Sequence, residues 1–511
     1  MLLKILMMAA FIAVTIYIGF RTRRSARDVD GFVLGGRKVG PWLSAFAYGT
    51  SYFSAVVFVG YAGQFGWRYG MAAIWIGLGN AFIGSLLVWY VLGARTRAMT
   101  HHLRAQTMPE FFGARFSSPA LRIAAAIIIF VFLIPYTAGV YNGLSRLFDM
   151  AFGVPYEWCV IVMAALTCIY VVMGGYMATA VNDLVQGSIM LFGIVAVIVA
   201  VLASHGGFDQ AMIALSQVPA DGAAGAAQMQ GAYVSIFGPD LFNLAGVFVL
   251  TSLGTWGMPQ MVQKFYAIKS IDAIKRGAII STLFAVVVAG GSYFLGGFAR
   301  LAASGIEYTA AGLPVYDSVI PAMLQNMPDL LLGLTVVLVL SASMSTLSAL
   351  VLTSSSTMTL DFIRGNFIRE MNARDQIVMI RLLIVVFVLI STFIALIQYN
   401  SPMTFIAQLM AISWGALAGA FLAPFLYGLY WQRTTAASVW ACFIFAVGLV
   451  VANMLLGYAM SPINAGALAM LAGLVIVPLV SWLTPRPDAA QTSALFKESY
   501  LNLHDMKIDA D

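Results

Sequence analysis

The sequence contains few charged residues, few histidines and few cysteines. Asp, Glu, Lys and Arg make up 9% of its 511 residues, and hydrophobic residues make up 61%. Since charged residues are typically about 25% of a soluble domain, this composition excludes a soluble globular protein. The three cysteines (Cys159, Cys168 and Cys442) lie in apolar runs without metal-ligand spacing, and the four histidines form no ligand set. Because no nucleophile motif or cofactor-binding loop is evident either, an enzyme is not expected.

Apolar runs long enough to cross a bilayer recur along the whole chain. About 20 mainly apolar residues form a helix of the required length. We expect an all-α polytopic membrane protein with thirteen transmembrane helices in one domain, residues 1–484, followed by a cytoplasmic tail, residues 485–511. Residues 2–20 are interpreted as a retained helix and not a signal peptide, because an arginine cluster follows and no cleavage site is evident. The expected spans are 2–20, 41–63, 72–93, 120–147, 157–173, 184–204, 241–262, 277–300, 329–358, 376–398, 403–430, 436–457 and 465–484.

Basic residues are distributed unevenly between the expected loops. The long loops 205–240 and 301–328 contain no Lys or Arg. Of the 27 Lys and Arg residues, those expected outside are Lys4, Arg68, Arg146 and Arg300. The others, Lys264 among them, are assigned to inner loops or the inner boundary. Because basic loops stay in the cytoplasm, the N-terminus is predicted outside and the C-terminus inside. The net charge of +6 is thus a topology signal and indicates no nucleic-acid partner.

Hydroxyl side chains form a row within the apolar residues 333–361. Ser341, Ser345, Ser348 and Ser355 are four, three and seven residues apart, and residues three or four apart share a helix face. A parallel row contains Ala342, Thr346, Ala349, Thr353 and Ser356. Such rows serve either close helix packing or ligand binding.

Two expected spans contain residues that interrupt helices. PWLSAFAYGTSYFSAVVFVGYAG (41–63) has Gly and hydroxyl residues at mid-membrane depth, and FNLAGVFVLTSLGTWGMPQMVQKF (242–265) has two glycines and a proline near its inner end. A glycine-rich packing seam is one interpretation. However, the two segments begin two five-span units, 41–204 and 241–430, and interrupted helices at matching positions of two repeats indicate a transport site.

Asp183 is the carboxylate that we expect to have a function. It lies where an inner loop becomes the span 184–204, and acidic residues within membrane spans are rare and usually face a pathway or a partner. The alternative is a charge at a helix N-terminus that interacts with the helix dipole. Glu157 and Asp361 are interpreted as ordinary charges at helix ends.

Five motifs in order resemble the sodium/solute symporter family, and some segments are closest to its proline-transporter branch. The motifs are FVLGGR (32–37), TMPEFFGARF (107–116), GGYMATAVND with Gln186 (174–186), WGMPQMVQKFYAIK (256–269) and GAFLAP with GLYW (419–424 and 428–431). The resemblance implies a LeuT-like 5+5 inverted-repeat core, with one extra N-terminal helix (2–20) and two extra C-terminal helices (436–484).

The resemblance also implies a sodium site between the first broken helix and the hydroxyl row. Its ligands would be the carbonyls of Thr50, Phe53 and Ala342 and the hydroxyls of Ser345 and Thr346. Asp183 would add a negative potential beside this site. Where relatives have a further hydroxyl for a second sodium ion, this sequence has Ala349, so one ion is expected.

A small-solute site is expected beside the sodium site. The segment 135–157 resembles the proline transporters, with Tyr136 at a pocket tyrosine, whereas Tyr52 and Val56 depart from their pattern. The candidate substrate-binding residues are Ser54, Ala55, Tyr136, Thr255, Trp256 and Gln408. Tyr136 and Trp256 could equally be structural aromatics.

The predicted function is sodium-coupled symport of a small organic solute, an amino acid such as proline or a monocarboxylate, into the cell. The protein is expected in the plasma membrane of a bacterium, surrounded by lipid and without an obligate protein partner. Proton coupling through Asp183 is an alternative on the same fold. A membrane sensor is another, although the tail 485–511 is too short for a signalling domain.

Overall fold

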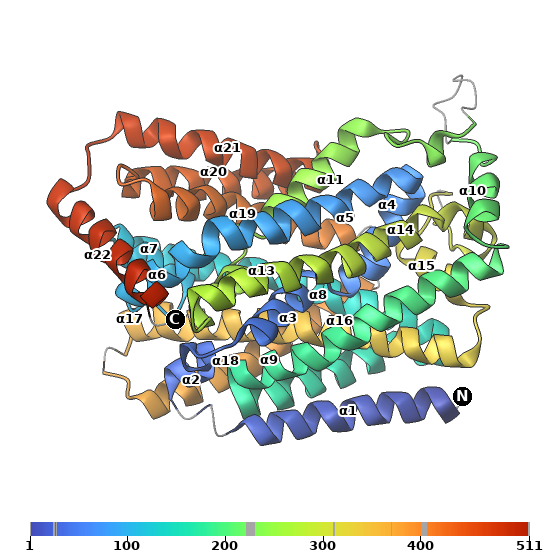
Figure 1. Cartoon of the computed structure of the whole chain (residues 1–511), viewed down its shortest axis with the longest axis horizontal. Helices are drawn as coiled ribbons and strands as arrows, with labels where there is room; N and C mark the ends of the chain where they lie inside the picture. Colours follow the sequence, from blue (N-terminus) through green and yellow to red (C-terminus); the bar gives the residue numbers. More distant parts are fainter. Residues whose placement is uncertain are drawn as a thin grey trace.

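The computed structural model describes residues 2–508 except 24, 25, 27, 221–229, 310, 311, 369 and 400–405. The start of the expected span 403–430, the basic residues Arg24, Arg27 and Arg369, and the last three residues of the tail lie outside the described residues. The described residues form an all-helical bundle, in which the long helices run roughly along one axis (Figure 1).

The bundle is built from 22 α-helices, joined in places by short π-helical or 3-10 turns. The α-helices are α1 (Leu2–Thr22), α2 (Val29–Leu34), α3 (Pro41–Tyr52), α4 (Ala62–Tyr69), α5 (Ile74–Ala81), α6 (Ala94–His102), α7 (Met108–Arg115), α8 (Pro119–Phe152), α9 (Tyr156–Ser204), α10 (Phe208–Ser216), α11 (Leu241–Gly254), α12 (Pro259–Ala267), α13 (Ile271–Ala285), α14 (Gly291–Gly297), α15 (Val319–Leu324), α16 (Asp329–Thr357), α17 (Arg364–Asn366), α18 (Ala373–Tyr399), α19 (Ile406–Tyr430), α20 (Ala436–Leu455), α21 (Pro462–Leu483) and α22 (Ala489–Ile508).

Eleven helical segments of the described chain are long and apolar enough to span a membrane, which differs from the thirteen expected. The difference comes from two long segments, Val56–His102 and Tyr156–Ser204, each of which contains two expected spans or parts of them. Each segment is broken once by a glycine with positive φ, Gly70 (φ 58°) and Gly175 (φ 55°). Both glycines adopt a backbone conformation that other residues rarely tolerate, so the chain can change direction there.

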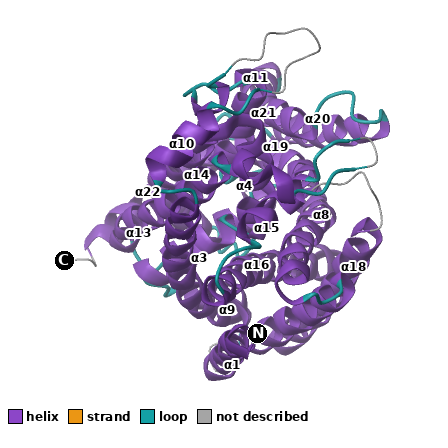
Figure 2. Cartoon of the chain, turned by 90° about the vertical axis from the view of Figure 1, so that its right-hand side faces the viewer, coloured by secondary structure: helices purple, strands orange, loops and turns teal. Residues whose placement is uncertain are grey.

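Two helices form the centre of the bundle. α19 and α16 are the most buried of the eleven segments, whereas α1 is the least buried. Figure 2 looks along the bundle and shows α16 near its middle and α1 at its margin. α1 exposes large apolar side chains, including Leu2, Leu6 and Tyr17, as expected for a surface that faces lipid. The hydroxyl row of α16 therefore lies in the interior and not at the lipid face.

The motif at residues 107–116 begins α7 with a side-chain cap. Thr107 Oγ1 accepts a hydrogen bond from the Glu110 backbone N–H at 3.2 Å, and a Glu110 side-chain oxygen accepts from the Gln106 N–H at 2.7 Å. These acceptors satisfy N–H groups that the first turn of a helix leaves free. The motif thus specifies where α7 starts at the end of the bundle that holds α6, α17 and α22, opposite the N-terminus (Figure 1).

Candidate substrate and ion site

Both expected helix breaks are present. α3 ends at Tyr52, Phe53 has extended backbone angles (φ −104°, ψ 91°), and a π-helical turn at Val56–Tyr61 leads into α4. The second break lies between α11, which ends at Gly254, and α12, which starts at Pro259. Because unwound backbone leaves carbonyl oxygens without helical partners, it is tolerated inside a membrane only where protein or a cavity surrounds it.

The carbonyl of Thr50, near the end of α3, faces two hydroxyls of α16. Ser345 Oγ and Thr346 Oγ1 each lie 3.2 Å from Thr50 O, and Ser345 Oγ also lies 3.1 Å from Ala342 O. All four residues are fully or almost fully buried. The structure thus brings together four of the five residues expected around a sodium ion. Phe53, the fifth, lies in the break three residues after Thr50.

Asp183 lies beside these oxygens, on the part of α9 that follows Gly175. A Cβ added at Gly187, one turn later, would be 2.8 Å from Thr50 Cγ2, so α9 approaches α3 this closely only because Gly187 has no side chain. The Thr50 hydroxyl interacts with Asp183 but donates its hydrogen bond to Phe46 O at 2.8 Å. As a result, the buried Asp183 carboxylate has no hydrogen-bond partner among the described residues.

Lys264 is the cation that pairs with Asp183, and it lies in a helix and not in a loop. It lies in α12, it is 3% exposed, and its Nζ is 4.0 Å from Asp183 Oδ2. At about this distance, opposite unit charges attract by roughly 4 kcal/mol at an effective dielectric constant of about 20. A lysine within an apolar span, soon after a break, was the signal that should have placed it in the interior.

Three other hydroxyls of the row are hydrogen-bonded, whereas those of Ser355 and Ser356 have no hydrogen-bond partner among the described residues. Ser341 Oγ donates to Val337 O and Ser348 Oγ donates to Ser345 O, which are bonds within the helix. Thr353 Oγ1 donates to Gln263 Oε1 at 2.8 Å and so connects α16 to α12. These bonds serve helix packing, and the contact of the row with the Thr50 carbonyl in the last turn of α3 is made by Ser345 and Thr346.

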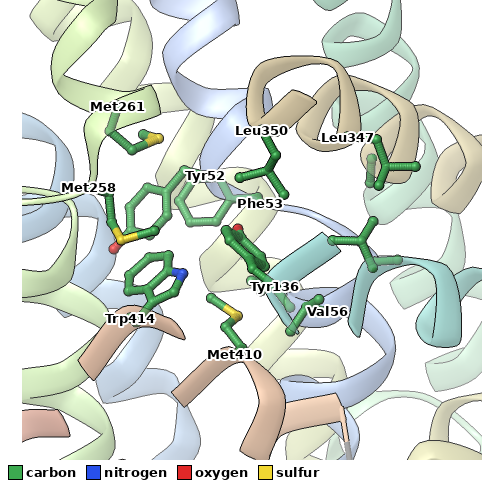
Figure 3. Packing of buried hydrophobic residues seen from close by; sticks show 14 of the residues in the cluster. Tyr52, Phe53, Val56, Tyr136, Met258, Met261, Leu347, Leu350, Met410 and Trp414 are labelled. Carbon is green, nitrogen blue, oxygen red and sulfur yellow. The ribbon is translucent and has the colours of Figure 1, made fainter. Parts of the chain in front are cut away.

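An aromatic cluster lies next to the first break (Figure 3). The Tyr52 ring stacks on Phe53 and on Trp414, with centroids 4.2 and 5.9 Å apart, and Tyr136 packs edge-on against Trp414 at 6.2 Å. Met410 belongs to the same buried cluster (Figure 3). Of these residues Tyr136 is among the candidates predicted from the sequence, whereas Trp414 and Met410 are not, although their spacing of four residues places both on one face of α19.

The other candidate substrate residues lie in different surroundings. Ser54 is buried in the first break. Ala55 packs against Gly143 of α8, and a Cβ added at Gly143 would be 3.2 Å from the Ala55 Cβ. Thr255 Oγ1 donates to Gly84 O, and Trp256 Nε1 donates to Ile83 O. These two bonds connect the second break to the turn Phe82–Leu87, so the polar atoms of Thr255 and Trp256 have protein partners.

Gln408 is only partly buried, near the start of α19 and two residues before Met410.

The interpretation of Asp361 as an ordinary helix-end charge is wrong. Asp361 is fully buried, and its carboxylate accepts hydrogen bonds from Thr107 Oγ1 at 2.6 Å and Arg122 Nε at 2.7 Å. Arg122 also pairs with Glu110 at 2.8 Å. The cluster joins α7 and α8 to the π-helical turn Met358–Ile363 that follows α16. Its members are too far apart in the sequence for their spacing to predict the contact.

Comparison with known proteins shows the family to which the chain belongs. The model of the sodium:solute symporter family matches residues 32–446. The chain belongs to the sodium:solute symporter family. The osmoregulated proline transporter OpuE of Bacillus subtilis is 28% identical over 501 residues, covering 94% of this chain and 94% of OpuE. The sodium/proline symporter of Escherichia coli is 28% identical over 441 residues, covering 82% of this chain and 81% of that protein.

Two solved structures have the same fold. A Na+-coupled sialic acid symporter in a substrate-bound outward-open state gives a TM-score of 0.75 at 16% identity, over 94% of this chain and 98% of that one. A nucleobase-cation-symport-1 family transporter in a closed conformation gives 0.53 at 13% identity, over 91% and 97%. The fold is therefore LeuT-like. The protein is a sodium-coupled solute symporter with many spans in the plasma membrane, and it is not an enzyme.

Asp317 connects an extramembrane turn to the start of α19. It lies in the turn Tyr316–Ser318, it is 7% exposed, and its Oδ2 accepts a hydrogen bond from the N–H of Ile406 at 3.3 Å. Burial raises the pKa of Asp317 to about 6, against the opposing effects of Arg146 and of the Ile406 N–H.

This pKa predicts a pH dependence of stability. Between about pH 4 and pH 6 the folded protein retains a proton on Asp317 that the unfolded chain has lost, so stability falls as the pH rises through this window. The full effect is on the order of 3 kcal/mol. Asp317→Asn removes the titration and keeps an oxygen for Ile406. We therefore expect its melting temperature, relative to wild type, to increase between about pH 4 and pH 6.5 and then to stay constant.

Glu307→Gln is the matched control, because Glu307 is an exposed carboxylate that pairs with Arg146 at 3.3 Å. The difference in melting temperature between Glu307→Gln and wild type should not rise between about pH 4 and pH 6.5. If the difference in melting temperature between Asp317→Asn and wild type were independent of pH, the buried Asp317 carboxyl would not titrate as described.

Proposed function

We propose that the protein imports proline together with one sodium ion. The main support is the Thr50 carbonyl facing the Ser345 and Thr346 hydroxyls, because unwound backbone and hydroxyl oxygens are the donors that hold sodium in transporters of this fold. The proline transporters among the relatives support the choice of substrate.

In this proposal the sodium ligands are the carbonyls of Thr50, Phe53 and Ala342 and the hydroxyls of Ser345 and Thr346. The two hydroxyls now donate to Thr50 O or Ala342 O. A hydroxyl can rotate about its C–O bond, so each can turn its lone pairs toward a cation and direct its proton elsewhere. Asp183 contributes a negative potential, and Ala349 offers no hydroxyl for a second ion.

The proposed solute site lies between the first break and the aromatic cluster. The side chains of Tyr136 and Ser54 interact with each other in this region, and Ala55, Thr255, Trp256 and Gln408 complete the candidate set. Rings and methionine suit the apolar pyrrolidine ring of proline, and polar groups of the break suit its carboxylate and amine. Thr255 and Trp256 would have to exchange their bonds to Gly84 and Ile83 for contacts with substrate.

The same proposal includes the membrane topology. Thirteen spans result if Val56–His102 is divided at Gly70, so that its first part joins α3, and Tyr156–Ser204 is divided at Gly175. The repeats would be 41–204 and 241–430. The N-terminus would face outward, and α22, at the opposite end of the bundle, would face the cytoplasm with the basic helix α6 (Figure 1).

The first test is uptake by purified protein in liposomes. We expect labelled proline to accumulate when an inward sodium gradient is imposed, and to accumulate more when the interior is negative, because one sodium ion carries one net charge with a neutral solute. A proton gradient without sodium should give no accumulation. Accumulation of proline driven by protons alone would refute the proposed coupling. Accumulation of a monocarboxylate in place of proline would refute the proposed substrate.

The second test concerns the ion ligands. Ser345→Ala and Thr346→Ala should each raise the sodium concentration for half-maximal uptake by about tenfold or more, since a lost hydrogen-bonding group of this kind is worth about 1–3 kcal/mol. Ser343→Ala is the matched control, because its buried hydroxyl bonds only to Val339 O of the same helix. Equal sodium activation in all three variants would exclude Ser345 and Thr346 as ligands.

A further inference from the structure

We propose that Lys264 is a built-in cation that takes the place of a second sodium ion at Asp183. This inference rests on the proposed sodium coupling. Asp183 and Lys264 form a buried pair, with Lys264 Nζ 4.0 Å from Asp183 Oδ2. Thr50 connects this pair to the proposed ion site, because its carbonyl belongs to that site and its hydroxyl interacts with Asp183.

Among the described residues, Lys264 is the group that compensates the negative charge of Asp183. The two side-chain oxygens of Asp183 have no hydrogen-bond partner among the described residues, and its side chain is 1% exposed. Lys264 is the charged group that acts on it. A buried carboxylate without hydrogen bonds requires a cation, and removal of the partner of such a pair is strongly destabilising.

Lys264 is held so that its ammonium remains at this position. Its Nζ lies 5.1 Å from the centre of the Tyr176 ring, which is on α9 near Gly175. The preceding residue, Gln263, accepts a hydrogen bond from Thr353 of α16. α12 is thereby tied to both α9 and α16, and the ammonium contacts Asp183 and Tyr176 of α9.

While the ammonium of Lys264 lies beside Asp183, it repels a free cation at this point. Ala349, which follows Ser348, adds no hydroxyl there. A tethered ammonium needs only the carboxylate and the ring face. The arrangement therefore gives Asp183 a permanent counter-ion and leaves one exchangeable cation for coupling.

The experiment compares Lys264→Met with wild type by thermal unfolding of purified protein in sodium and in potassium. We expect Lys264→Met to be less stable than wild type in potassium and to recover more strongly in sodium, because a free sodium ion replaces the lost ammonium and a bound ligand stabilises the folded state. The Hill coefficient for sodium should rise from about one toward two. In liposomes, the reversal potential should shift from the value for one sodium ion per proline toward the value for two.

Three further variants make the result decisive. Lys264→Arg keeps the cation and should keep the single-ion behaviour. Lys269→Met removes an exposed lysine nearby and should match wild type. In Asp183→Asn/Lys264→Met both charges are absent, so this protein should be more stable in potassium than Lys264→Met and should lose the additional response to sodium.

Two outcomes would overturn the proposal. One is a Lys264→Met protein with the sodium response and ion ratio of wild type. The other, which applies even if Lys264→Met does not fold, is a double variant no more stable than Asp183→Asn. If wild-type protein shows no sodium response at all, the proposed coupling fails, whereas the charge pair is still tested by the double variant in potassium.

Discussion

The structure depends on a contact between the last turn of a helix that ends inside the bundle and a second helix that supplies hydroxyl groups. α3 stops at Tyr52 inside the bundle, and the carbonyl of Thr50 meets Ser345 and Thr346 of α16. An unpaired carbonyl in this environment would cost several kcal/mol. The break in α3 and the hydroxyl row of α16 therefore require each other, and together they provide a site at which a cation can replace hydroxyl protons as the partner of backbone oxygen.

Asp183 and Asp361, two of the buried carboxylates, belong to two separate groups of charged residues. Asp183 and Lys264 join α9 to α12 next to the site. Asp361, Arg122, Glu110 and Thr107 join the turn that follows α16 to α7 and α8. Since burying a charge is costly unless it is paired, each group holds its helices in register, and each must reorganise if those helices separate. α16 thus connects the ion site to the end of the bundle opposite the N-terminus.

Features that repeat along one helix were predictable from the sequence, and those that join distant segments were not. The breaks near Phe53 and Gly257 follow from local glycine and proline, and the row on α16 follows from helical spacing. The family motifs also led to Thr50, Ala342, Ser345 and Thr346. By contrast, the pairing of Lys264 with Asp183 and the burial of Asp361 depend on contacts between helices. The stacking of Trp414 on Tyr52 brings together residues on α19 and α3, which no local pattern indicates.

A structure determined with sodium and proline, at a resolution that shows the ion and the hydroxyl rotamers, tests the central claim most directly. The account predicts density for one ion surrounded by the carbonyls of Thr50, Phe53 and Ala342 and the hydroxyls of Ser345 and Thr346, with both hydroxyl protons turned away from it. Saturating sodium with no density there, and with Ser345 and Thr346 still donating to the Thr50 carbonyl, would contradict it.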